Sequence, residues 1–293
     1  MKGVHLLLTY TCNRACDHCF VYGGPEARGA FTLQQVSDVL DQLPAVGTIE
    51  TVCFEGGEPF LFYPIMLEGI RLARGMGFNA GVVTNAYWAL SEQDAEVWLK
   101  PLRESGLAAV SISDDSLHYG DERDLRARNV QSAAAGLGMT VSVLRTERPS
   151  VTVNERGEQV IAGGVMFRGR AAEKLVAGLP TQPSEAFTKC PFEDLRNPGR
   201  VHVDAYGNVH LCQGLLMGNV WDRPMAELVK GYGPDTHPLV GPLLRGGPAA
   251  LAEQYGAAPG AECVSACHLC YLVRRALLDR FPQFLAPRQV YGL

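Results

Sequence analysis

Three cysteines lie within eight residues near the start of the chain, Cys12, Cys16 and Cys19, at spacings of x3 and x2. Thiolates gathered this closely can surround one small inorganic centre, and they favour zinc or an iron–sulfur cluster. A closed tetrahedral zinc site, or a four-iron cluster held by protein alone, needs four ligands. Because this segment offers only three, the pattern indicates a four-iron cluster with one iron free for an added chelator.

This spacing resembles the cluster loop of the radical S-adenosylmethionine (SAM) enzymes. In that family the free iron of the [4Fe–4S] cluster chelates SAM, and one electron splits the sulfonium to a 5′-deoxyadenosyl radical. A second segment, Gly56-Gly57-Glu58-Pro59, stands about forty residues downstream and closely resembles the family's GGE motif. Glycines let the backbone approach a ligand closely. The resemblance implies that Glu58 offers its carboxylate to the SAM ammonium group.

Other polar residues at predicted strand ends are candidates for SAM contact. Hydroxyl and amide groups suited to the ribose and carboxylate of SAM occur at Thr84, Asn85, Ser111 and Ser113. Turn formation or helix capping is an equally open role for them. Arg145 can pair with the SAM carboxylate or stay solvated beside Glu147, and Arg168 and Arg170 share that ambiguity. His18 occupies a place where relatives usually carry an aromatic residue, so it can stack near adenine or lie exposed in the loop.

Asp114, Asp115 and His118 are the candidates for substrate chemistry. A carboxylate there could bind a substrate amine or take a proton after hydrogen abstraction. The alternative is a helix N-cap with an acidic first turn. The charged run at 122–128 is interpreted as a solvated helix face.

Five further cysteines follow residue 180: Cys190, Cys212, Cys263, Cys267 and Cys270. Cys212 lies on the predicted return strand of a hairpin around Tyr206-Gly207-Asn208. This arrangement resembles the SPASM or Twitch extension, which holds auxiliary iron–sulfur clusters. Five thiols suit one auxiliary [4Fe–4S] cluster, with Cys263 the residue expected to be spare.

Alternatives stay open for these cysteines. Three of them could ligate the cluster and leave one iron open to substrate. A structural zinc site would equally hold the hairpin that carries Cys212 against the C-terminal segment that carries Cys263, Cys267 and Cys270. Cys53, isolated on a predicted strand, is interpreted as core packing.

Apolar runs alternate with amphipathic stretches over the first half of the chain. The predicted strands cover 4–9, 48–54, 79–83, 108–113 and 139–144. The predicted helices cover 32–43, 63–75, 91–104 and 120–137. This order gives right-handed βαβ units and a parallel sheet. Periodicity leaves both a barrel and a doubly wound sheet open; the family resemblance implies a partial (β/α)6 barrel.

The second half of the expected barrel is less regular. Short runs at 151–153 and 159–162 predict a hairpin in place of a helix, followed by a sixth strand at 165–167 and a closing helix at 171–178. A proline-rich boundary then separates a barrel over 1–180 from a small cysteine-rich auxiliary-cluster domain over 181–293.

The composition describes an ordered globular chain, with 47% hydrophobic and 19% charged residues among 293. A net charge of −5 argues against nucleic acid as a partner. Neither a signal peptide nor an apolar run of about 18 residues is evident, so no membrane is expected. Nine cysteines, an odd count in two tight clusters, favour metal in a reducing compartment and predict a cytoplasmic protein.

The leading hypothesis is a radical SAM enzyme that abstracts hydrogen from a peptide or protein, the usual substrates of enzymes with such an extension. The resemblance also implies an electron donor such as ferredoxin or flavodoxin. Eleven residues precede Cys12, so no leader-recognition domain is expected there, and a peptide substrate would need a separate recognition protein or none. One alternative is a radical SAM enzyme acting on a small-molecule precursor. A non-catalytic iron–sulfur carrier or a zinc-stabilised binding protein is the alternative of another class.

Overall fold

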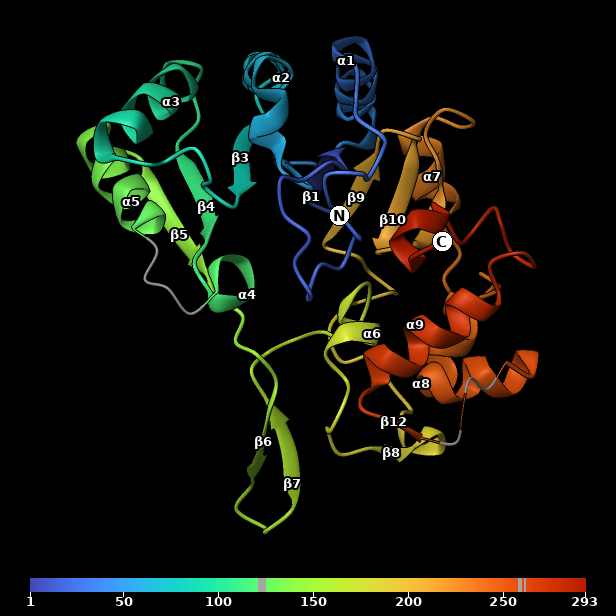
Figure 1. The fold of residues 1–293 in the computed structure, drawn as a ribbon. Helices are drawn as coiled ribbons and strands as arrows, with labels where there is room; N and C mark the ends of the chain where they lie inside the picture. Colours follow the sequence, from blue (N-terminus) through green and yellow to red (C-terminus); the bar gives the residue numbers. More distant parts are fainter. Residues whose placement is uncertain (121–124, 258–259, 261) are drawn as a thin grey trace.

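The computed structural model describes residues 1–120, 125–257, 260 and 262–293. Within these ranges a curved eight-stranded sheet lies at the centre of the fold, in the order β11-β10-β9-β1-β2-β3-β4-β5 (Figure 1). Neighbouring strands from β1 to β5 are parallel. Their bounds are β1 (Gly3–Thr9), β2 (Thr51–Gly56), β3 (Asn79–Thr84), β4 (Ala109–Ser113) and β5 (Thr140–Leu144). The predicted α/β fold with a partial barrel is confirmed.

Helices cover the outer face of this part of the sheet (Figure 1). They are α1 (Leu33–Gln42), α2 (Tyr63–Gly75), α3 (Glu92–Glu104) and α5 (Arg126–Gly136). The short 3-10 turn η1 (Pro44–Val46) follows α1, and η2 (Pro59–Phe62) precedes α2. The short helix α4 (Ser116–Tyr119) lies instead at the C-terminal ends of β4 and β5 (Figure 1). Thr32 begins α1 through a reciprocal capping box with Gln35. Ser91 begins α3 by accepting a hydrogen bond from the Asp94 amide. The first three predicted helices are therefore confirmed.

The predicted helix 120–137 and the charged run at 122–128 fall partly outside the described residues, which omit 121–124. The described part of that helix begins at Arg126 and ends at Gly136. A separate short helix, α4, precedes it and begins after Asp115.

The predicted hairpin is confirmed as β6 (Ser150–Val153) paired with β7 (Gln159–Ala162), and it projects away from the barrel (Figure 1). The predicted sixth strand is wrong, because residues 165–167 are outside any strand of the described chain. Gly163 and Gly164 both have positive φ and turn the chain out of extended backbone there. The closing helix is also shorter than predicted, since α6 covers only Ala171–Lys174.

The sixth parallel strand comes instead from the C-terminal half. β9 (Arg200–Asp204) pairs in parallel with β1, on the side opposite β2. β10 (Asn208–Cys212) and β11 (Leu215–Asn219) extend the sheet as antiparallel neighbours, which confirms the predicted hairpin. Strands on both sides of the predicted boundary at residue 180 thus share one sheet.

The remaining C-terminal elements pack beside this sheet (Figure 1). They are β8 (Gln182–Pro183), η3 (Ser184–Ala186), α7 (Met225–Gly231), α8 (Val240–Tyr255), β12 (Glu262–Cys263), α9 (Ala266–Ala276) and η4 (Arg288–Tyr291). Of these, α8 and α9 pack against each other, and β12 pairs with β8. The helix α9 begins at Ala266, so Cys267 and Cys270 lie in its first turns.

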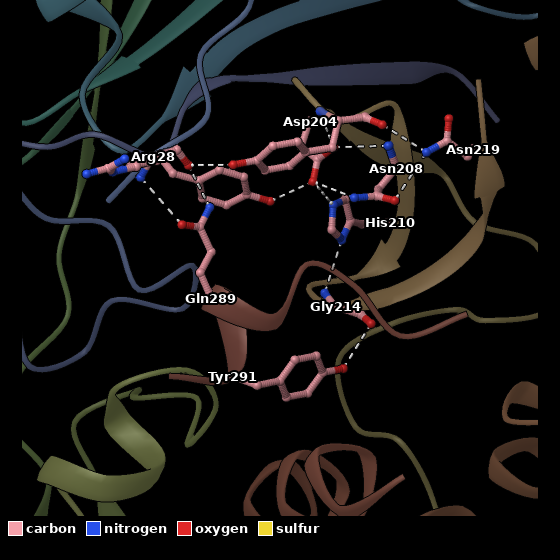
Figure 2. Close-up of polar contacts among 10 residues, drawn as sticks. Arg28, Asp204, Asn208, His210, Gly214, Asn219, Gln289 and Tyr291 are labelled. Carbon is pink, nitrogen blue, oxygen red and sulfur yellow. Dashed lines mark hydrogen bonds and ion pairs between the residues drawn. The ribbon is translucent and has the colours of Figure 1, made fainter. Parts of the chain in front are cut away.

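A buried polar network fixes β9 and β10 against β1 (Figure 2). The Asp204 carboxylate accepts hydrogen bonds from the Tyr10 hydroxyl at 2.8 Å and the Asn208 amide at 3.0 Å, and His210 Nε2 lies 3.1 Å away. The Gly214 amide donates to His210 Nδ1, so His210 is a neutral ring that donates from Nε2 to Asp204. This network anchors Tyr10, just before the first cysteine motif, to the strand that carries Cys212.

Candidate functional site

The three cysteines of the N-terminal motif line one cavity of about 590 Å³ at the C-terminal ends of β1 to β5. The loop that carries them starts directly after β1. The Cys12 amide donates to the Gly24 carbonyl at 3.0 Å, and the Cys19 amide donates to the Cys16 carbonyl at 3.1 Å. Burial raises the pKa of the Cys12 thiol to about 11 and that of Cys16 to about 12. Binding of a metal would have to displace those protons.

Arg170 holds this cysteine loop closed. Its guanidinium donates to the Cys16 carbonyl at 2.7 Å and to the Gly23 carbonyl at 2.9 Å, on either side of Cys19. It also lies over the ring of Tyr22, 5.0 Å from the ring centre. Pairing of Arg170 with SAM stays a prediction. Its observed contacts tie the backbone together on either side of Cys19.

Gly56 and Gly57 end β2 against the start of the cysteine loop. A Cβ on Gly56, whose φ is +140°, would lie 2.3 Å from the Thr9 carbonyl oxygen, and one on Gly57 would lie 2.2 Å from that of Thr11. Both glycines line the cavity. Their absent side chains therefore let β2 close against the segment before Cys12, in addition to any role in approaching a ligand.

Glu58 is fully buried behind these glycines. Its carboxylate accepts hydrogen bonds from the Phe60 amide, the Thr84 hydroxyl and the Asn85 amide, at 3.1, 2.7 and 2.8 Å. Burial raises the pKa of Glu58 to about 7 despite these three donors. The carboxylate thus joins the end of β2 to the end of β3, and Pro59 is buried beside it. Contact between Glu58 and SAM stays a prediction.

Thr84 and Asn85 line the cavity, but their polar atoms are largely used by the chain. The Thr84 hydroxyl also accepts from the Ala86 amide, and Asn85 Oδ1 accepts from the Tyr87 amide. These are the turn contacts considered from sequence. On β4, Ser113 lines the cavity whereas Ser111 lies outside its lining.

Asp115, His118 and His18 meet at the edge of the cavity. Asp115 is the N-cap of α4, and its Oδ1 lies 2.8 Å from His118 Nδ1. Burial would raise the pKa of Asp115, but His118 outweighs that effect and lowers it. The ring of His18 lies edge-on to that of His118 at 4.6 Å. Burial, reinforced by His118, lowers the pKa of His18 to about 4, so His18 is neutral at physiological pH.

Asp114 and Arg145 pair with each other rather than with a buried partner. Arg145 Nη2 lies 2.6 Å from Asp114 Oδ2, and the arginine side chain is 68% exposed. Arg145 still lines the cavity, whereas Asp114 lies outside its lining. Of the two adjacent aspartates, only Asp115 lines the cavity, and the catalytic role of both stays a prediction.

Four of the five C-terminal cysteines surround a second, small cavity: Cys190, Cys212, Cys267 and Cys270. Cys263 is buried on β12 and lies outside that lining. Two buried arginines, Arg168 and Arg274, also line this cavity. Arg168 Nη1 lies 2.9 Å from Cys212 Sγ, and Arg168 also lines the first cavity. One side chain therefore reaches both cysteine sites.

The two donor sets fit iron–sulfur clusters. The first has three thiols facing a cavity with room for a further ligand, and His18 Nδ1 is buried there with no hydrogen-bond partner in the described chain. The second has four thiols, which complete a cluster's coordination, and cationic neighbours that balance thiolate charge. All nine cysteines, each within the described ranges, are free thiols.

Sequence reasoning missed three polar residues on one face of the sheet, His5, Glu55 and His202. Glu55 lines the first cavity and is flanked by the two imidazoles. A histidine at position 5, inside an otherwise apolar strand, was the available signal.

Comparison with known proteins finds a family match for part of the chain. Residues 6–130, which include the N-terminal cysteine loop and the GGE segment, match the model of the Radical SAM superfamily. One solved structure, of BtrN in complex with AdoMet and 2-DOIA, has the same fold. It is 17% identical with a TM-score of 0.51, over 78% of this chain and 81% of that one.

Curated relatives match over parts of the chain. YydG of Bacillus subtilis (strain 168), whose name refers to peptide biosynthesis, is 20% identical over 55% of this chain and 52% of its own. Mycofactocin maturase MftC of Mycobacterium tuberculosis (strain ATCC 25618 / H37Rv) is 27% identical over 50% of this chain and 39% of its own. An S-adenosylmethionine-dependent nucleotide dehydratase of Selenomonas ruminantium is 32% identical over 28% and 29%. The chain thus spans about half the length, or less, of these relatives.

Among the described helices, none is long and apolar enough to cross a membrane.

Proposed function

We propose that this protein cleaves SAM reductively and uses the resulting radical to abstract hydrogen from a peptide or protein substrate. The observation that carries the proposal is the shared cavity. The thiols of Cys12, Cys16 and Cys19, the glycines of the GGE segment and the Asp115–His118 pair all line it. An electron carrier or a zinc-stabilised binding protein would have no use for such a cavity beside its metal site.

Cys12, Cys16 and Cys19 would hold a [4Fe–4S] cluster whose fourth iron stays open to SAM. When bound, such a cluster would pass one electron from the external reductant to the SAM sulfonium, and this reductive cleavage would supply the hydrogen-abstracting chemistry. The chain's own part is orientation. Arg170 fixes the loop, and Glu58 fixes the ends of β2 and β3 around the cavity.

The Asp115–His118 pair would accept a proton from the substrate. Asp115 also accepts from the His118 and Thr146 amides, which favours its ionised form, so His118 Nδ1 is the donor in their 2.8 Å contact. His118 Nε2 is then free to accept a proton within the cavity. A carboxylate that orients an imidazole in this way supports general-base catalysis.

An extended substrate fits the surroundings of the first cavity. A second open cavity of about 630 Å³ shares Gly164, Val165 and Met166 with it. Its other lining residues include Val160 of the projecting hairpin and Phe192, both exposed hydrophobics. Together the two cavities offer an apolar path to the radical site, as a peptide would need. The name of YydG, which refers to peptide biosynthesis, supports the same substrate class.

Two partners complete this proposal. A reductant such as ferredoxin or flavodoxin would deliver the electron, and a separate recognition protein would present a peptide substrate. Cys190, Cys212, Cys267 and Cys270 would hold an auxiliary [4Fe–4S] cluster, with Arg168 and Arg274 offsetting its negative charge.

A small-molecule substrate is the second candidate. The observation that favours it is the match to a nucleotide dehydratase, at 32% identity over 82 residues. Deuterium-labelled substrates distinguish the two candidate functions. Deuterated peptides encoded beside the gene are supplied in one assay, and deuterated nucleotide or sugar precursors in another. Transfer into 5′-deoxyadenosine from a peptide supports the first proposal, and transfer from small molecules alone supports the second.

Anaerobic reconstitution tests the enzyme class itself. We expect about eight iron atoms per chain, if both four-iron clusters are complete, and SAM cleavage with dithionite. Replacing Cys12, Cys16 and Cys19 together by alanine should remove about four iron atoms and abolish cleavage, while the auxiliary chromophore remains. Cys53→Ser is the matched control, because Cys53 lies outside both cysteine cavities. A colourless zinc protein that leaves SAM intact would refute the proposal.

A further inference from the structure

A second group of metal-ligating side chains lies on the sheet, separate from both cysteine sites. His5 is on β1, Glu55 on β2 and His202 on β9, which are three adjacent strands. His5 is in register with His202 on one side and with Cys53 on the other. Since residues two apart in a strand share a face, His5, Glu55 and His202 project from the same side of the sheet.

Their ligand atoms are close together. His5 Nδ1 lies 3.2 Å from one Glu55 carboxylate oxygen, and His202 Nε2 lies 3.0 Å from the other. The chosen atoms of all three side chains lie within 4.8 Å of one another. Bonds of about 2.1 Å at angles between octahedral and tetrahedral separate neighbouring ligands by roughly 3.0–3.4 Å. Each histidine–carboxylate distance lies in this range, to a different Glu55 oxygen, and the 4.8 Å limit on all three atoms is close enough for small side-chain movements to bring them onto one ion.

The surroundings also suit a cation. The side chains of His5, Glu55 and His202 are only 24%, 12% and 12% exposed. Burial would raise the pKa of Glu55, but His202 and His5 outweigh it and hold that pKa well below its usual value. Burial lowers the pKa of His202, which favours its neutral, ligating form. The three side chains thus place one carboxylate and two imidazoles together in a mostly buried space.

We propose that His5, Glu55 and His202 bind one divalent transition-metal ion, such as Zn²⁺ or Fe²⁺, at the inner wall of the first cavity. Two imidazoles and one carboxylate form the ligand set of open metal sites that keep positions for exogenous ligands. Glu55 lines the cavity, whereas His5 and His202 lie outside its lining, so a ligand would reach the ion from the cavity beside Glu55. There the ion acts as a Lewis acid toward oxygen or nitrogen donors. The proposal does not depend on SAM cleavage, since none of its three ligands is a cysteine or a residue of the GGE segment.

Zinc binding to the reconstituted holoenzyme tests this site. The protein, with its iron counted, is stripped of loosely bound metal by a chelating resin and titrated with Zn²⁺ under anaerobic conditions. We expect one zinc per chain with the iron count unchanged. Glu55→Gln and His202→Gln should each weaken zinc binding by about tenfold or more. Removal of a residue that only supports a metal ligand already lowers metal affinity by about tenfold or more, and removal of the ligand itself should lower it at least as much.

His118→Gln is the matched control. It removes an imidazole from His18, Asp115 and His118, the other group of two histidines and a carboxylate found among the described residues. Zinc binding should survive this change. Zinc lost equally from His118→Gln, or retained by a variant carrying both Glu55→Gln and His202→Gln, would overturn the assignment. So would absence of stoichiometric zinc from a holoenzyme that holds its full iron.

X-ray absorption at the zinc edge gives a readout that does not depend on variant folding. The bound ion should show nitrogen and oxygen neighbours alone. Sulfur in its coordination shell would place the zinc at displaced cysteine sites and refute the proposal. A protein that binds zinc at this site but fails to cleave SAM would contradict the proposed function and leave the metal site standing, so the two failures are distinguishable.

Discussion

Replacing Glu58 by glutamine changes the pH dependence of stability in a direction that the structure fixes. The carboxyl group is fully buried, and burial raises its pKa from 4.5 to about 7. The folded chain therefore holds this proton more tightly than the unfolded chain does. Its favourable contribution to folding is complete below pH 4.5 and is lost as pH rises through 7. Glutamine has nearly the same shape as the protonated acid but does not titrate.

The expected magnitude follows from the two pKa values. Each tenfold difference in proton affinity is worth about 1.4 kcal/mol, so the change from 4.5 to about 7 corresponds to about 3 kcal/mol. Most of this lies between pH 5 and pH 8. At about 2–4 °C per kcal/mol, the Tm of the wild-type protein should fall relative to that of Glu58→Gln by roughly 5–10 °C over this range. The altered hydrogen bonds at position 58 shift the Tm of the variant by a further amount that does not vary with pH.

Anaerobic differential scanning calorimetry of both holoenzymes at several pH values measures the difference. The control is Glu50→Gln, whose carboxylate is 58% exposed and pairs with Lys2 at the surface; its Tm should follow the wild-type curve. A Tm difference between wild type and Glu58→Gln that stays constant from pH 5 to pH 8 would refute a buried, proton-retaining carboxyl. A difference that changes in the opposite direction would show that the three donors outweigh burial.

Three further predictions concern the loop, the cavity and the network. Arg170→Gln loses the charged contacts to the Cys16 and Gly23 carbonyls. It should lower iron retention at the N-terminal site and leave the absorbance of the auxiliary cluster unchanged. Equal loss of iron at both sites would argue against a local role for Arg170. His118→Gln should lower substrate turnover by about 10²-fold or more, as expected for a general base, while SAM cleavage without substrate continues; loss of both would contradict proton transfer. Asp204→Asn should lower stability by about 1–3 kcal/mol because it leaves a buried neutral donor unmatched, and an unchanged Tm would refute this.

Much of the barrel could be predicted because its signals are local. The capping box at Thr32, the cap at Ser91 and the alternation of apolar strands with amphipathic helices each depend on residues close in sequence. Those elements agree with the structure to within a few residues. The hairpin of β6 and β7 was equally local, since four-residue strands flank a short turn.

The sixth strand was misplaced because strand pairing is not local. Residues 165–167 carry a plausible apolar run, yet two glycines with positive φ turn the chain away just before them. β9 lies nearly two hundred residues from β1 in sequence and still pairs with it, since its apolar side chains complete the same core. No pattern within either segment specifies that pairing.

The sequence alone determined the chemistry available: a trio of thiols, a glycine–glutamate segment and a second group of cysteines, all identifiable by type and spacing. Only the tertiary structure decided which of these groups meet. It placed Cys263 outside the second cavity, buried Glu58 behind the first, and brought His5, Glu55 and His202 together across three strands. The physical reason is that side-chain types are a local property, whereas proximity, burial and charge pairing arise only when distant segments pack into one core.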